Sequence, residues 1–401
     1  MTGPDATRDR KLLYASAFVR ATATGFVGVL TGLHLAAAGL GDAELGVVVA
    51  CGLGAAALAA LAVTLAGDRL GRRRSLVAVT LLGGAGGAAF ALAASPLWLA
   101  FAAFLGMVNG MGRDRGAALV LEQAALPATT DDAGRTAAFA AYNVAQDLGH
   151  AAGALLASMP ALFRGAGLDS LAASRSSLLV YAALALLPVL LYARLSPAIE
   201  APRAPRVRLG PESRRRVTRL AALFALDSVG GGFLTTALVA LFVHQRFGAG
   251  EGALAALFFG ARILNAVSHI GAAFLAKRIG LVNTMVFTHL PSSLLLATVT
   301  IAPSFEVAVL LFLLREGLVE MDVPTRQSYV VAVVAPEERT VAAGVTHIVR
   351  MAGWAVAPAA AGLIAAGDDL GAPLVVGAAL KIVYDITLWL AFRRVRPPEE
   401  I

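Results

Sequence analysis

The chain lacks most features that identify a soluble enzyme or a disulfide-stabilised domain. Of its 401 residues only 15% are charged, and Cys51 is the single cysteine, so no intramolecular disulfide can form. The sequence has no His-Glu-x-x-His motif, no Gly-x-Ser-x-Gly motif and no cluster of cysteine with histidine, so we expect no enzyme, metal site or cofactor. It also lacks a Gly-x4-Gly-Lys-Ser/Thr loop, which argues against an ATP-driven pump.

Apolar sequence is what the chain has in abundance. Hydrophobic residues make up 58% of it, which is typical of a polytopic membrane protein. The net charge of +7 does not indicate nucleic-acid binding, because the arginines gather in short turns between apolar runs, where they set membrane orientation. We interpret the polar start, Met1 to Lys11, as a retained cytoplasmic tail.

The apolar runs predict twelve membrane-spanning helices, since about 20 residues are needed to cross the hydrocarbon layer. We place them near 13–38, 43–66, 74–94, 97–125, 135–162, 175–195, 219–245, 251–275, 279–303, 304–334, 338–366 and 371–393. A basic stretch with three prolines separates the sixth from the seventh and is interpreted as a cytoplasmic linker. The predicted organisation is a bundle over 1–195, the linker over 196–218 and a second bundle over 219–401, with both termini in the cytoplasm.

The two halves of the chain repeat each other. The matching pairs are Arg20-x4-Gly25-Phe26 with Asp227-x4-Gly232-Phe233, Arg135-Thr136-x-Ala138 with Arg339-Thr340-x-Ala342, and Asp68-Arg69-Leu70-Gly71 with Lys277-Arg278-Ile279-Gly280. The first two pairs are offset by 207 and 204 residues. Because these offsets nearly agree, one six-helix unit occurs twice.

A basic turn follows the second predicted span and reads Gly67-Asp68-Arg69-Leu70-Gly71-Arg72-Arg73-Arg74. Lipid rejects arginine, so such a turn stays in the cytoplasm, and a plain stop-transfer signal would explain the arginines. It would not explain the aspartate and its spacing to the glycine. The turn resembles the loop signature of the major facilitator superfamily of transporters, and the repeated halves and the basic linker extend this resemblance over the full chain.

The resemblance implies an all-α membrane protein with twelve transmembrane helices in two pseudo-symmetric six-helix bundles. It implies a secondary transporter that works by alternating access, binds a small-molecule substrate between the halves and is sufficient as a monomer in the lipid bilayer. It also implies a cytoplasmic latch, in which the aspartate pairs with a basic residue of the other half and meets a helix N-terminus. The latch residues are Gly67, Asp68, Arg69, Gly71, Arg72 and Arg73.

The direction of transport is less well indicated. Drug/proton antiporters of this family have Arg-x-x-Gln-Gly in the fourth span, where this chain has Gly112-Arg113-Asp114-Arg115-Gly116. The connection Ala335-Pro336-Glu337-Glu338-Arg339 looks like that of many bacterial efflux members. We therefore expect proton-coupled efflux of a small solute or drug-like compound across the bacterial inner membrane. The alternatives are proton-coupled uptake of a small organic anion and a non-transporting receptor on the same fold.

Ionisable residues within the apolar runs are the candidates for transport chemistry. A charge near mid-bilayer costs about 2.5–3.5 kcal/mol on insertion scales, so these groups must pair or face water. Proton coupling needs a carboxylate or histidine whose pKa shifts with burial and a change of partner. The candidates are Asp147, His150, Asp227, Glu316 and Glu320. The alternative for each is a permanent salt bridge.

Five arginines are candidates for the substrate cavity: Arg20, Arg113, Arg262, Arg315 and Arg350. Guanidinium groups bind carboxylate or phosphate, which suggests an anionic substrate, although nearly as many acidic neighbours would make the cavity close to neutral. Arg20 and Asp227 occupy equivalent positions in the two halves, so we expect a pair between them that closes the cytoplasmic mouth. The alternative is a separate partner for each.

Overall fold

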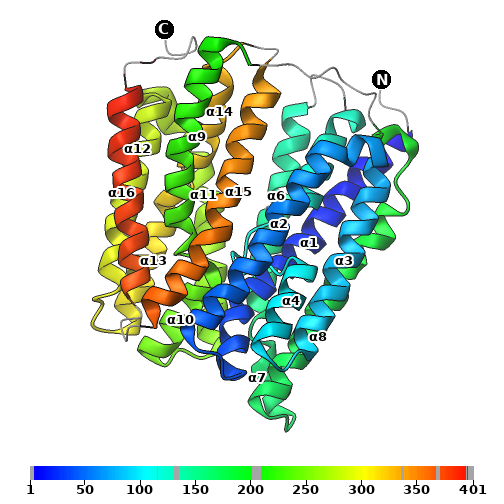
Figure 1. The fold of residues 1–401 in the computed structure, drawn as a ribbon, viewed down its shortest axis with the longest axis vertical. Coiled ribbons are helices and arrows are strands. Elements are labelled where there is room, and N and C mark those ends of the chain that lie inside the picture. Colours follow the sequence, from blue (N-terminus) through cyan, green and yellow to red (C-terminus); the bar gives the residue numbers. More distant parts are fainter. Residues whose placement is uncertain are drawn as a thin grey trace. The chain divides into compact units, whose positions relative to one another are not determined.

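The computed structural model describes residues 4–114, 116–130, 135–200, 209–335, 338–366, 371–393 and 395. Within these ranges the chain is helical and has no strand (Figure 1). The helices are α1 Pro4–Ala37, α2 Asp42–Leu70, α3 Arg72–Leu92, α4 Pro96–Gly106, α5 Ala117–Ala125, α6 Arg135–Leu156, α7 Met159–Gly165, α8 Ser170–Tyr192, α9 Pro211–Gly232, α10 Thr236–Phe247, α11 Glu251–Ile279, α12 Leu281–Val299, α13 Phe305–Val319, α14 Asp322–Ala332, α15 Arg339–Ala365 and α16 Ala372–Phe392. Two short 3₁₀ turns cover Leu126–Thr129 and Pro197–Ile199.

The helices fit the length of a membrane. Among the described residues, nine helical stretches are long and apolar enough to span one. Each of the twelve predicted spans contains at least one helix, and the fourth, fifth, seventh and tenth are each divided between two helices. The prediction of an all-α membrane protein is therefore confirmed.

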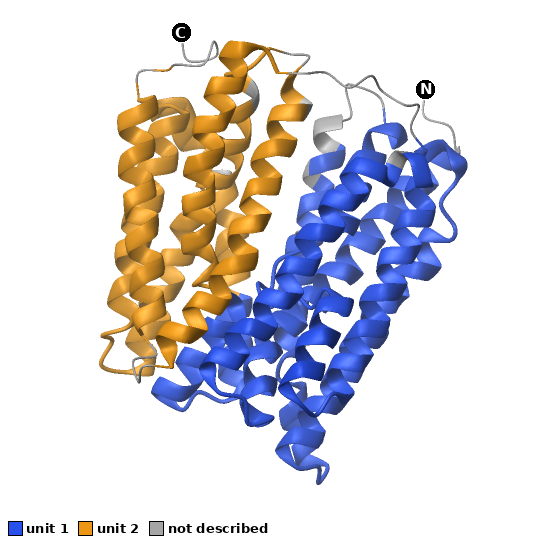
Figure 2. Ribbon diagram, in the orientation of Figure 1, with its two compact units in different colours: residues 1–204, 235–259 blue, residues 205–234, 260–401 orange. Residues whose placement is uncertain are grey.

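The chain forms two compact units (Figure 2). Unit 1 contains residues 1–204 and 235–259, and unit 2 contains residues 205–234 and 260–401. The units thus differ from the predicted bundles 1–195 and 219–401, because α10 and the start of α11 belong with the first. The predicted linker 196–218 also differs: residues 201–208 lie outside the described part, and α9 already begins at Pro211, where proline suits the first turn of a helix.

The fourth predicted span is interrupted by residues 107–116, here called the segment-4 loop, of which Arg115 is not described. Helix α4 ends because Met107, directly after it, adopts the left-handed conformation, with φ 49°. Further along the loop, Gly112 also has a positive φ, of 64°. Asn109 then holds the loop: its Oδ1 accepts the Met111 N–H at 2.9 Å, and its Nδ2 donates to the Arg113 carbonyl at 2.7 Å.

The seventh predicted span breaks between Gly232 and Thr236, directly after the three glycines 230–232. Glycine loses more conformational freedom in a helix than other residues, so such a run favours a break. The Thr235 hydroxyl starts the next helix by accepting the Leu238 N–H at 3.2 Å. The break coincides with the passage of the chain from unit 2 to unit 1.

Two features repeat between the units and agree with the sequence duplication. Gly71 and Gly280 each form a one-residue turn between long helices, with φ of 90° and 85°, a conformation that other residues rarely adopt. Glycines offset by 204 residues also lie at close helix contacts in both units. A Cβ at Gly149 would lie 2.4 Å from the Phe18 carbonyl oxygen, and one at Gly353 would lie 2.8 Å from the Ser228 Cβ.

Candidate functional site

A buried ion cluster lies inside unit 1, around Arg20 on α1. Its guanidinium forms ion pairs with Asp114 of the segment-4 loop and with Glu122 on α5. Glu122 is fully buried and also accepts the hydroxyls of Tyr142, at 2.6 Å, and Tyr192, at 2.5 Å. Three helices, α1, α6 and α8, thus place donors on one carboxylate, which compensates for its loss of water.

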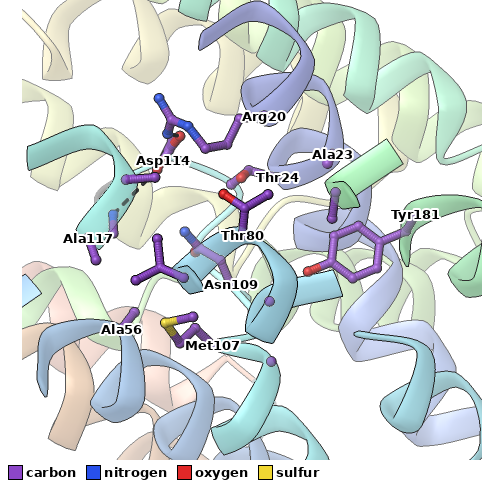
Figure 3. Close-up of a pocket in the computed structure, with 16 residues that line it drawn as sticks. Arg20, Ala23, Thr24, Ala56, Thr80, Met107, Asn109, Asp114, Ala117 and Tyr181 are labelled. Atoms are coloured by element: carbon purple, nitrogen blue, oxygen red, sulfur yellow. Dashed lines mark hydrogen bonds and ion pairs between the residues drawn. The ribbon is translucent and has the colours of Figure 1, made fainter. Parts of the chain in front are cut away.

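A cavity of about 110 Å³ adjoins this cluster. Arg20 and Asp114 lie together at one side of it, with Thr24 and Thr80 beside them and Asn109 and Tyr181 further along (Figure 3). The rest of the wall is small and mostly apolar, and includes Ala23, Ala56, Val79, Gly83, Ala117 and Ala185. All of these residues belong to unit 1.

Unit 2 has its own buried cluster, around Asp227 on α9. Lys381 Nζ lies 2.7 Å from one carboxylate oxygen, and Arg326 and Arg350 lie 3.5 Å and 3.6 Å from the other. Arg326 also pairs with Asp322, one turn away on α14. Asp227 is 3% exposed, so this carboxylate is held by cations rather than by solvent.

His289 on α12 extends the Asp227 cluster. Its Nδ1 lies 2.9 Å from both carboxylate oxygens of Asp385, which is fully buried on α16. Its Nε2 lies 3.4 Å from Lys381 Nζ and 3.8 Å from Asp227. One imidazole therefore stands between two buried carboxylates, an arrangement that can pass a proton from one to the other.

The two clusters are equivalent in position and opposite in charge. Arg20 contacts Glu122 in unit 1, and Asp227 contacts Arg326 in unit 2. The offsets are 207 and 204 residues, the same as those of the sequence repeat. Each member of the expected Arg20–Asp227 pair thus has partners within its own unit, which is the alternative that the sequence had left open.

A third group lies between α11 and α13 in unit 2. Asn265 donates from Nδ2 to Glu316, at 2.8 Å to the carbonyl and 2.9 Å to the carboxylate. Arg262 donates to Asn265 Oδ1 at 3.4 Å, and Arg315 pairs with Glu316. Glu320 is also buried and lies at the junction of α13 and α14. The structure thus brings Arg262, Arg315 and Glu316 together.

The remaining sequence candidates lie on α6 and in the segment-4 loop. His150 is buried, and its Nε2 accepts the Asp114 N–H at 3.0 Å, so this nitrogen carries no proton. Asp147 is half-buried on the same helix. Arg113 is half-buried in the loop and does not line the cavity, whereas Arg20 does.

The basic turn after α2 is built into unit 1. Glu200 accepts the backbone N–H groups of Arg72, at 2.6 Å, and Arg73, at 3.1 Å, and so caps α3. The side chain of Arg72 donates to the carbonyl of Ala124, at 2.8 Å. Arg69 is exposed, Gly67 is buried, and the side chain of Asp68 lies outside the described residues.

Sequence reasoning missed several members of the clusters. Glu122, Asp322 and Arg326 were not among the candidates, and all three are buried and paired. The 204-residue offset between Glu122 and Arg326 would have revealed these two. His289 and the tyrosines gave no such signal, because a lone polar residue in an apolar run carries no partner with it.

The sequence belongs to a known family. Residues 13–358 match the family model of the Major Facilitator Superfamily, and this is most of the chain. The chain is therefore a member of the Major Facilitator Superfamily, and as such a secondary transporter rather than an enzyme. An uncharacterized membrane protein of Saccharomyces cerevisiae, YJR124C, is 25% identical over 426 residues, covering 96% of this chain and 94% of that one.

Solved structures of transporters share the fold. A bacterial homolog of the human lysosomal transporter Spinster, in an inward-facing and occupied conformation, is similar with a TM-score of 0.78, 14% identity and coverage of 98% of both chains. The nucleoside transporter NupG gives 0.76 with 15% identity, covering 96% of this chain and 99% of its own. A D-xylose-proton symporter gives 0.69 with 16% identity, covering 96% and 98%. At these identities the likeness concerns the fold, and the twelve-helix type agrees with it.

Proposed function

We propose that this transporter is a proton-coupled exporter of a small solute or drug-like compound that works by alternating access as a monomer. The observation that carries the coupling is the buried chain of titratable groups formed by Asp227, His289 and Asp385 in unit 2. A proton on one of these groups changes which cations the carboxylates can hold. Conformational preference and proton binding are thereby linked.

The break in the seventh span supports a moving part. Glycines 230–232 end α9 in unit 2, and α10 begins in unit 1 at Thr236. Discontinuous helices in transporters place backbone groups and flexible joints near the substrate. We assign residues 230–235 as the joint about which the chain bends, and we retain the turn Gly67 to Arg73 as the cytoplasmic latch.

Glu316 is a second proton-binding candidate. Its carboxylate is buried and already has two partners, Asn265 and Arg315, between which it could alternate. Asp147, His150 and Glu320 complete the proposed coupling groups. The location proposed for the protein is the bacterial inner membrane, with both termini in the cytoplasm.

Uptake of a small organic anion is the competing proposal. The three cations around Asp227 favour it, because a second anion could join them when the carboxylate is protonated. Export and uptake then differ in whether the proton moves against the solute or together with it.

The test is proton movement in proteoliposomes that contain the purified full-length chain and an entrapped pH-sensitive dye. An inside-acid gradient is imposed, and organic ammonium ions, organic anions and uncharged solutes are added outside in turn. If the protein is an antiporter, protons leave as the substrate enters, and the interior becomes more alkaline. If it is a symporter, protons enter with the substrate, and the interior becomes more acidic. Glu316→Gln should uncouple or abolish the response, and Glu306→Gln, exposed on the same helix, should leave it intact. Solute flux that ignores the gradient would contradict proton coupling.

A further inference from the structure

Among the residues that the structure describes, the ion cluster beside the cavity of unit 1 holds fewer cations than carboxylates, and Arg113 of the same loop does not line the cavity. Arg20 is one cation between two carboxylates, Asp114 and Glu122. Glu122 has the two tyrosine hydroxyls as additional donors and does not line the cavity, whereas Asp114 does. His150 adds no charge through the nitrogen that faces Asp114, because that nitrogen accepts a hydrogen bond.

The contacts of the Asp114 carboxylate suit a negative charge. Its carboxylate pairs with Arg20 and accepts the Gly116 N–H at 3.3 Å, at the N-terminus of α5. A helix N-terminus and a guanidinium both stabilise negative charge. At the other end of the segment-4 loop, Gly106 and Met107 line the cavity at the C-terminal end of α4, where a positive charge is favoured.

We infer that this cavity binds a small organic ammonium ion, with Asp114 as its counter-ion. When the ligand is bound, its ammonium pairs with Asp114 while Arg20 keeps Glu122, so two cations meet two carboxylates. The hydroxyls of Thr24 and Thr80 and the amide of Asn109 accept the remaining N–H groups, and the alanines and glycines of the wall contact a short alkyl chain.

The size of the cavity restricts the ligand. A cavity of about 150 Å³ accommodates benzene. The cavity here is smaller, at about 110 Å³, so it suits a primary amine of roughly four or five heavy atoms.

The segment-4 loop connects this site to α10. The carbonyl of Gly110 accepts the Ala237 N–H at 3.0 Å, and that of Met111 accepts the Thr236 hydroxyl at 2.7 Å. Asp114 belongs to the same loop, so a ligand that draws Asp114 away from Arg20 acts on the loop that holds α10. In this respect the inference rests on the proposed transport function, since the ligand is then cargo.

The test is equilibrium binding, which does not depend on transport. Purified full-length protein in detergent micelles is titrated with propylammonium, and with propionate and 1-propanol as ligands of matched size, while unfolding temperature and heat of binding are recorded. Propylammonium should bind saturably in the millimolar range and the other two should not, since so few atoms give limited affinity. Asp114→Asn should weaken binding at least tenfold, and Glu44→Gln, at an exposed carboxylate on α2, should not.

A second variant keeps the inference testable if Asp114→Asn does not fold. Ala56→Leu fills the cavity without changing its charge and should abolish binding. Binding of propionate in place of propylammonium, binding of none of the three ligands, or ammonium binding that survives Ala56→Leu would each overturn the inference. Proton-coupled transport of another solute by protein that binds no propylammonium would leave the proposed function intact and overturn the ammonium site alone.

Discussion

At the scale of single residues, Asp227 is a buried carboxylate that three cations of unit 2 share. Its carboxylate is the shared partner of Lys381, Arg326 and Arg350, all within 3.6 Å. A buried charge is tolerated when it is paired, and removal of one partner leaves the others uncompensated in a medium that solvates them poorly. Substitution of Asp227 should therefore lower the stability of the folded protein more than loss of any one of its cations.

We predict that Asp227→Asn destabilises the protein by about 3–5 kcal/mol, the range seen when one partner of a buried ion pair is lost. The measurement is denaturant unfolding in detergent micelles, followed by tryptophan fluorescence. Glu212→Gln on the same helix is the matched control: Glu212 pairs with Arg216 at the surface, and its loss should cost less than about 1 kcal/mol. Equal effects from the two substitutions would show that the cluster contributes no more than a surface pair.

At the scale of helices, close glycine contacts decide which pairs can pack. Gly149 lets α6 approach α1 so closely that a methyl group would lie 2.4 Å from the Phe18 carbonyl oxygen. Backbone atoms cannot move aside as a flexible side chain can, so the whole helix would have to shift. Gly54 on α2, by contrast, has no neighbouring atom within 4 Å of the position of an added Cβ.

Gly149→Ala should therefore destabilise the protein by about 1–3 kcal/mol or more, as overpacking does. Gly54→Ala should be neutral or stabilising by up to about 1 kcal/mol, because alanine is the better helix former. Thermal unfolding of the purified variants distinguishes the two. A stable Gly149→Ala protein with unchanged transport would contradict the close approach of α1 and α6.

The start of α9 depends on a residue from the start of α15. A hydrogen bond from the Gly210 N–H, and a second from the Ser213 hydroxyl, hold the pKa of the Glu338 carboxyl below its ordinary value. Gly210 is the N-cap residue directly before α9, so Glu338 satisfies a backbone donor that the helix itself leaves unpaired. The carboxylate form is thus favoured in the folded protein.

Because the folded pKa is lowered, this contribution to stability is present above the unfolded pKa, near 4.5, and is lost as the pH falls through the folded pKa. Glu338→Gln should lower the unfolding temperature at pH 7, and the difference from the unchanged protein should shrink below pH 4.5. Unfolding temperatures measured from pH 7 to pH 3.5 provide the check. A difference that stays constant over this range would contradict an ionised cap.

At the scale of the whole molecule, the chain passes between units at the break before α10. Hydrogen bonds from Thr236 and Ala237 attach α10 to the segment-4 loop within unit 1. Thr236 is thus a point at which the attachment can be weakened without removal of a charge. Thr64 on α2 is a suitable comparison, because its hydroxyl bonds to the Ala60 carbonyl of its own helix.

We predict that Thr236→Val increases backbone hydrogen exchange in residues 107–114 and in α10, since one of the bonds between them is lost. Thr64→Val should leave exchange in both segments unchanged. Hydrogen–deuterium exchange with mass spectrometry resolves the two regions. Unaltered exchange in the loop would mean that α10 is held by other contacts.

The sequence predicts those features of the fold and of the candidate site that depend on local or repeated patterns. Apolar length predicted the spans, and the offset of Arg20 to Asp227 predicted the repeat, because both are local or repeated patterns. The breaks in the fourth, fifth, seventh and tenth spans were not predicted, because apolar runs look alike whether helical or not, although three consecutive glycines before Phe233 favour a bend. The partners of Glu122 and Asp227 were also not predictable, since pairing depends on which helices become neighbours.

The opposite polarity of the Arg20–Glu122 and Asp227–Arg326 pairs constrains how the two units diverged. Copies of one ancestral segment start with the same pair, and reversing either by single changes passes through two like charges enclosed in apolar surroundings. Such an intermediate is destabilised unless neighbouring groups offset the charge. Lys381 beside Asp227 carries an opposite charge, whereas the tyrosine hydroxyls around Glu122 stabilise a carboxylate by hydrogen bonds without changing the net charge. Exchange of one member of a pair between the halves would place like charges together, so the halves are not interchangeable at these positions.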